Sequence, residues 1–280
     1  MSQYTVPPPA YGPGSSSPKS NYRSTDNESR EPLLGSPRAS GSGAIYDQPA
    51  HDDLPDDFKY GVSVSESSPE IRNAFVRKVY TILLFQILAT CIVGGGISQS
   101  SSAIFWVQTH VWAFYIPLFG TIINLGLLYW KRHTHPWNFV LLSTFTLMEA
   151  FTLGVVVAFY DNVIVLQALL ITLGVFIGLT LFTFQSKYDF SGMGPFLFGA
   201  LIALVMTGFV GIFIPFGRTM DLIFAVGGCL IFSGYIVYDT YIINKRLSPD
   251  EFIMGAISLY LDFINLFINI LRLLNNLQER

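Results

Sequence analysis

Charged residues are scarce in this sequence. They make up 12% of its 280 residues, about half of the ~25% found in soluble globular domains. The shortage is uneven, because the first 70 residues are polar and most of the remaining chain is apolar. This pattern excludes an ordinary soluble globular protein and indicates an integral membrane protein with a polar N-terminal tail.

Cysteine is also scarce. The two cysteines, Cys91 and Cys229, both fall inside apolar runs, so neither a disulfide framework nor a cysteine metal site is indicated. The N-terminal residues lack the apolar stretch of a signal peptide, and we expect the first spanning segment to serve as the membrane signal. We expect neither a cofactor nor a nucleic-acid partner.

Residues 1–70 form the tail, which is rich in Pro, Ser, Gly and Asp. Such a segment buries too little apolar surface to offset its ordering entropy, so we expect a disordered cytosolic tail preceding a transmembrane domain at 71–280. Pro8, Pro9 and Tyr11 form a PPxY pattern of the kind that WW domains bind. A chance match in a proline-rich tail is the equally weighted alternative.

Seven apolar runs follow, each near the ~20 residues that a helix needs to cross a bilayer. We therefore predict an all-α integral membrane protein, a bundle of seven helices. The runs are residues 79–98, 111–130, 137–159, 163–184, 194–215, 220–243 and 252–274. Ser248, followed by Pro249 and then Glu251, predicts the start of the last helix.

Lysine and arginine gather on one side of the predicted spans, which predicts a cytosolic N-terminus. The loops on the opposite side hold only Arg218. The basic residues of the first side are Arg72, Arg77, Lys78, Lys131, Arg132, Lys187, Lys245 and Arg246. Seven crossings would place Arg272 on the non-cytosolic side, against the same rule. This conflict leaves open that the last segment is re-entrant.

Two aspartates lie inside apolar runs, Asp239 in the sixth and Asp262 in the seventh. A carboxylate at the centre of a spanning helix costs roughly 2.5–3.5 kcal/mol, so it marks a candidate functional site. The intervening loop makes the helices neighbours, but Asp239 lies about 8 Å from it along the helix and Asp262 about 16 Å. Contact therefore needs a tilted helix or a shifted loop. In contact, the two acids would share one proton, and the deprotonated pair would attract calcium transiently.

Polar residues recur every three or four positions along the last run, so they form one stripe of a helix. The stripe consists of Ser258, Asp262, Asn265, Asn269, Arg272 and Asn276. In a membrane it must face the bundle interior or a water-filled cavity, so Asn265 and Asn269 are pore-lining candidates. The alternative is that the asparagines are polar links between helices.

Three further residues are candidates for the pore or for a latch that closes it. Glu149 is the third acid inside a span, and it either lines the same cavity or is a neutral acid bonded to a neighbouring helix. Lys131 and Arg132 end the second span and could reach the acids as an ion pair. The alternative is that both cations only set the topology.

Five segments together resemble the Bax inhibitor motif family, in the branch of the Lifeguard and Golgi anti-apoptotic proteins. They are Arg72–Gln86, Glu149 with Phe159–Asp161, Gln185–Phe190, Tyr238–Thr240 and Ile257–Leu274. The resemblance covers residues 70–280 and implies seven helices with the last one central. It also implies a pH-dependent calcium leak from internal stores and protection from cell death and endoplasmic-reticulum stress.

The resemblance also assigns residue roles and a location. The family's pH-sensing acid pair falls on Asp239 and Asp262, and the cation that latches onto it in bacterial members falls on Lys131, where lysine replaces arginine. The implied home is the endoplasmic reticulum, Golgi or vacuole membrane, with the bilayer, calcium ions and cell-death regulators as partners.

Two other classes of function are alternatives to a calcium leak channel, an enzyme and a scaffold. An intramembrane aspartyl protease also uses two aspartates, but Asp262 lies in Tyr-Leu-Asp rather than Gly-x-Gly-Asp, and no Pro-Ala-Leu motif follows; we therefore predict no enzymatic activity. A membrane scaffold that modulates cell-death or stress proteins without transporting ions is the alternative to a calcium leak channel.

Overall fold

In a computed structural model, residues 63–110, 112–215 and 217–278 are described. This part of the chain is helical and contains no strand. The PPxY pattern and most of the predicted tail lie outside it. Packing against the bundle begins before residue 71, since Val64 is fully buried and its N–H donates to the Leu247 carbonyl at 2.9 Å.

Within the described residues, seven helices are long and apolar enough to cross a membrane, which confirms the predicted helical membrane bundle. They are α2 (Pro69–Gln99), α4 (Trp112–Lys131), α5 (Trp137–Val157), α6 (Asn162–Gln185), α7 (Gly194–Phe213), α8 (Arg218–Lys245) and α9 (Phe252–Gln278). The short elements are η2 (Val64–Glu66), α3 (Ser101–Thr109), η3 (Phe190–Met193) and η4 (Pro249–Glu251).

Two features differ from the sequence prediction. Helix α2 begins ten residues before the predicted Val79, because the Ser68 side chain caps its first turn and Pro69 occupies the first helical position. Hydropathy marks only the apolar part of such a helix. Helix α3 was not predicted because its nine residues are too few to span; Ser100 ends α2 and accepts a hydrogen bond from the Ala103 N–H.

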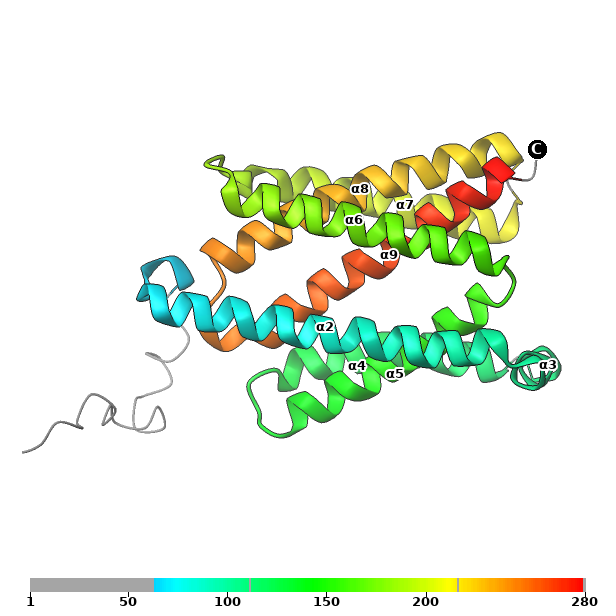
Figure 1. The fold of residues 1–280 in the computed structure, drawn as a ribbon, viewed down its shortest axis with the longest axis horizontal. Helices are drawn as coiled ribbons and strands as arrows, with labels where there is room; N and C mark the ends of the chain where they lie inside the picture. The colour runs from blue at the N-terminus through cyan, green and yellow to red at the C-terminus, as the bar shows by residue number, and fades with distance from the viewer. Residues whose placement is uncertain (1–62, 111, 216, 279–280) are drawn as a thin grey trace, which may run out of the picture. The chain divides into compact units, whose positions relative to one another are not determined.

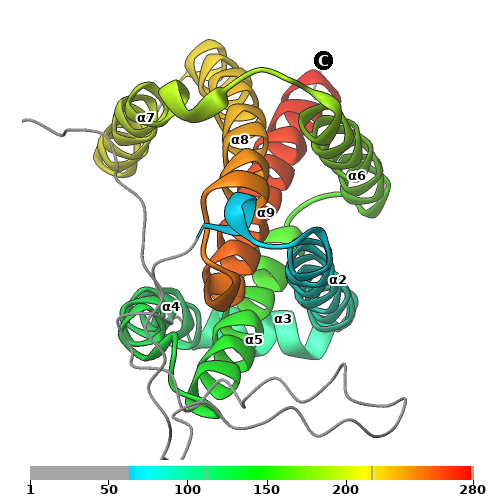
Figure 2. The same ribbon diagram turned by 90° about the vertical axis from the view of Figure 1, so that its left-hand side faces the viewer.

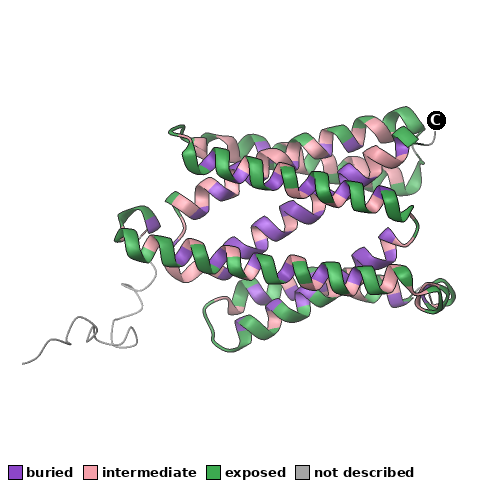
Figure 3. Ribbon diagram, viewed as in Figure 1, coloured by how far each residue is buried: buried purple, intermediate pink, exposed green. Residues whose placement is uncertain are grey.

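Helix α9 is the central element, as Figures 1 and 2 show. In its most apolar stretch 72% of the residues are buried, compared with at most 44% in any other long helix. It packs on α8, α2 and α6, while α4 packs on α5 and α7 on α8 as outer helices. Figure 3 shows the buried residues following α9 along most of its length.

The last segment is one continuous helix from Phe252 to Gln278, with no break at which a re-entrant segment would turn back, and it is long and apolar enough to cross a membrane. The start predicted at Ser248 is present, since the Ser248 N–H donates to the Glu251 carboxylate at 3.3 Å. In Figure 1, α9 runs obliquely across α2 and α6. This tilt changes which level of α9 faces α8.

Candidate functional site

The structure brings the two intramembrane aspartates together. The Asp239 carboxyl lies within hydrogen-bonding reach of the Asp262 carboxyl and of the Ser258 side chain. Ser258 lies one turn before Asp262, so both project from the same face of α9 toward α8. The sequence indicated different depths for the two acids, and the oblique course of α9 provides the tilt that their contact requires.

Asp262 is 6% exposed, and its Oδ2 atom is buried with no hydrogen-bond donor among the described residues. Asp239 is only partly buried. Ionised carboxylates are acceptors only, so contact between the two requires either a proton on one of them or a cation between them. The pair can therefore hold a proton, or exchange it for a cation with oxygen-ligand preference.

Tyr235 was not predicted as part of this site. It lies one turn before Asp239 on α8 and interacts electrostatically with both acids. Its spacing of four residues from Asp239 was the available sequence signal. Among the described residues, no group of three or more His, Cys, Asp or Glu side chains gathers as a metal site.

The polar stripe of α9 contacts α8 at several levels, from Ser258 and Asp262 beside Asp239 to Asn276 beside Asp221. Asn265 and Asn269 donate to carbonyls of their own helix, Leu261 at 2.8 Å and Asn265 at 2.7 Å. The Asn269 amide also fills the space beside Gly228, where a Cβ atom would overlap with it. Asn269 therefore packs against α8, whereas the side-chain hydrogen bond of Asn265 lies within α9.

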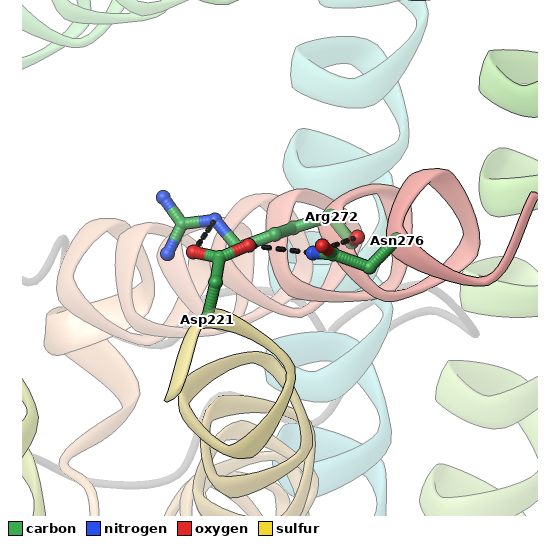
Figure 4. Close-up of polar contacts among 3 residues, drawn as sticks. All are labelled: Asp221, Arg272 and Asn276. Atoms are coloured by element: carbon green, nitrogen blue, oxygen red, sulfur yellow. Dashed lines mark hydrogen bonds and ion pairs between the residues drawn. The ribbon is translucent and has the colours of Figure 1, made fainter. Parts of the chain in front are cut away.

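The stripe ends in a polar cluster, drawn in Figure 4. Asp221 of α8 accepts from the Asn276 amide at 2.5 Å and pairs with Arg272 Nε at 3.7 Å. Arg218 donates to the Asn276 carbonyl. This cluster explains Arg272 at the less basic end of the bundle, because Asp221 offsets its charge there.

Asp221 lies in the first turn of α8 and was not among the predicted site residues. The signal that could have found it is Arg272 itself, since ionisable residues within spans commonly pair with one another. The guanidinium of Arg272 also lies 5.0 Å from the Phe224 ring.

Glu149 and the two proposed latch cations lie elsewhere. Glu149 interacts electrostatically with Tyr260 on α9, and the groups found to interact with the aspartate pair do not include it. Arg132 forms an ion pair with Glu251 at 3.2 Å, and the Lys131 ammonium lies 5.0 Å from the Trp130 ring. The latch contact expected at the aspartates is therefore not formed; Arg132 instead ties the end of α4 to η4.

The comparisons with known proteins agree with this architecture. The sequence pattern of a family described as inhibitor of apoptosis-promoting Bax1 matches residues 72–279. Bax inhibitor 1 of Schizosaccharomyces pombe is 46% identical over 224 residues, 80% of this chain and 84% of that protein. The Golgi anti-apoptotic protein of vaccinia virus (strain Lister) is 42% identical over 79% of this chain and 93% of its own length.

A mammalian relative is similar over a comparable share of the chain. Protein lifeguard 4 of Mus musculus is 41% identical over 227 residues, 81% of this chain and 95% of that protein. The family match to residues 72–279 covers nearly the whole described bundle, including the aspartate pair and the polar stripe of α9. The chain is thus a multi-pass membrane protein that belongs to the Bax inhibitor family.

Proposed function

We propose that this protein is a proton-regulated calcium leak channel of an intracellular membrane, with a cytoprotective, anti-apoptotic role. The observation that supports the proposal most is that the Oδ2 atom of Asp262 is buried beside the Asp239 carboxyl and accepts no hydrogen bond from the described residues. A protonated pair is neutral and suits a closed, dry bundle. A deprotonated pair is a pair of hard oxygen ligands, which calcium prefers.

The family relationship supports the cellular part of the proposal. The relatives carry names that state an anti-apoptotic role and, for the viral protein, the Golgi. The proposed home is therefore the Golgi or endoplasmic-reticulum membrane, or the vacuole, with the N-terminus in the cytosol. No enzymatic activity and no resident cofactor are part of the proposal.

The test is calcium efflux from vesicles that contain the purified full chain. We expect efflux to change across neutral pH, and Asp262→Asn to abolish that change because an amide does not titrate in this range. Glu70→Gln is the matched control, since Glu70 is an exposed acid in the first turn of α2. Identical pH profiles for the wild type and Asp262→Asn would reject the proposal.

The alternative is a membrane scaffold that modulates cell-death or stress proteins without transporting ions. The cluster around Asp221 favours the scaffold, because there the polar residues of α9 hold α8 and α9 together and need no role in ion transport. Protection of cells by a variant that passes no calcium in vesicles would select the scaffold.

A further inference from the structure

A groove of 430 Å³ lies at the end of the bundle where lysine and arginine gather, between α2, α6 and α8. Three cations and two amides make up its polar lining: Arg72, Arg77, Lys245, Asn73 and Asn244. These residues come from the start of α2 and the end of α8, which the fold brings side by side. No carboxylate lines the groove among the described residues.

The three cations are not neutralised by other described side chains. The ion pairs within the described part of the bundle join Arg132 to Glu251 and Arg272 to Asp221. Within the described residues, the three positive charges that face this one volume therefore form no ion pair with a carboxylate. Arginine presents a planar fork of donors that matches a phosphate, and lysine adds a point charge.

The groove also has an apolar side. Val76 and Phe184 complete its lining, and the Phe184 side chain is 37% exposed. Phe184 of α6 contacts Tyr80 of α2 with ring centroids 5.9 Å apart. A charged group in the groove would thus lie directly beside the apolar surface of two spanning helices.

A second, apolar cavity lies further along the same two helices, where α5 and α9 also line it. It has a volume of 150 Å³, and α2 and α6 contribute residues that include Ile87, Cys91, Val165 and Leu169. On α2 the cavity lining begins at Ile87, about 16 Å of helix rise beyond Val76, and on α6 its nearest residue, Leu169, lies about 23 Å from Phe184. The near end of the cavity is therefore about one leaflet's depth, ~15 Å, or somewhat more from the groove.

We propose that the groove binds the phosphorylated headgroup of an anionic phospholipid, with an acyl chain that follows α2 and α6 to the apolar cavity. Basic pockets between spanning helices on the cytosolic side are suited to such headgroups. A free phosphate would satisfy the cations but leave the apolar cavity unused. Lipid and free anion therefore make different predictions.

The first arm measures binding of phosphatidylinositol 4-phosphate to the full chain in nanodiscs of phosphatidylcholine. We expect Arg77→Gln with Lys245→Gln to weaken binding at least about tenfold, since each surface cation contributes about fivefold. Lys187→Gln, a basic residue outside the groove lining, should leave binding within about twofold. Equal binding by the double variant and the wild type would overturn the proposal.

The second arm separates a lipid from a soluble anion and guards against misfolded variants. Asn244→Trp fills the groove with all charges kept, and it should weaken lipid binding as the double variant does. Leu169→Trp fills the apolar cavity and should weaken the long-chain lipid only. Soluble inositol 1,4-bisphosphate that binds as tightly as the lipid, or unaltered lipid binding by both tryptophan variants, would overturn the proposal.

Discussion

The contact between α2 and α5 predicts a specific effect of one methyl group. A Cβ atom at Gly154 of α5 would lie 2.8 Å from the Gly94 Cα atom and 3.0 Å from the Gly94 carbonyl oxygen. Both neighbours are backbone atoms of α2, so they cannot rotate away. Small residues at such positions let spanning helices approach closely, and van der Waals contact then holds them together.

The magnitude of Gly154→Ala follows from two opposed effects. Alanine is favoured over glycine in a helix by about 1 kcal/mol. Overpacking a well-packed contact costs typically about 1–3 kcal/mol, and backbone overlap lies at the upper end. We expect a net loss of about 1–2 kcal/mol, which raises the unfolding equilibrium constant about 5- to 30-fold.

The assay is reversible unfolding of the purified chain in mixed micelles, with Gly95→Ala as the control. Gly95 lies beside Gly94 on α2. A Cβ atom added at Gly95 would meet no atom within 4 Å outside the backbone of its own helix. We expect the control to be as stable as the wild type or more stable. A Gly154→Ala protein as stable as Gly95→Ala would refute the close packing of α2 on α5.

Three further predictions concern the contact of α8 with α9, the ion pair between α4 and η4, and the polar cluster around Asp221. Gly228→Ala should destabilise the bundle by about 1–3 kcal/mol because its methyl group meets a buried amide of α9, whereas Gly227→Ala, with open space around it, should not; unfolding measurements compare the two. The Arg132–Glu251 pair should show a coupling of about 0.5–1 kcal/mol in a double-mutant cycle; additive single effects would remove this tie between α4 and η4. Asp221→Asn leaves the arginine of α9 without its carboxylate, so thermal stability should fall at all pH values near neutrality, and an unchanged melting temperature would contradict the cluster in Figure 4.

The seven spans could be predicted from the sequence because hydropathy and length are local properties. The centrality of α9 was indicated by the resemblance, and its burial follows from large apolar residues on several faces, such as Tyr260 and Phe263. The early start of α2 and the presence of α3 could not be read from hydropathy, since their signals are a serine cap and a short helix outside the membrane pattern.

The aspartate pair was found from its chemistry, but its contact depended on a tilt that helix rise alone does not give. The partners of the cations were the weakest predictions. A long side chain such as Arg132 can reach several acids from one position. Its actual partner, Glu251, is known only once the fold places the end of α4 near η4. Asp221 was missed for a related reason, because its role depends on Arg272, which lies 51 positions away in the sequence.

The central claim is that Asp239 and Asp262 act as one proton-exchanging unit that controls calcium efflux. The most direct test is the pH profile of efflux from vesicles for the wild type, Asp239→Asn, Asp262→Asn and the double variant. If the pair shares a proton, each single change removes the pH response and the double variant adds nothing further. Independent and additive effects of the two changes, or a pH response that survives in the double variant, would contradict the account.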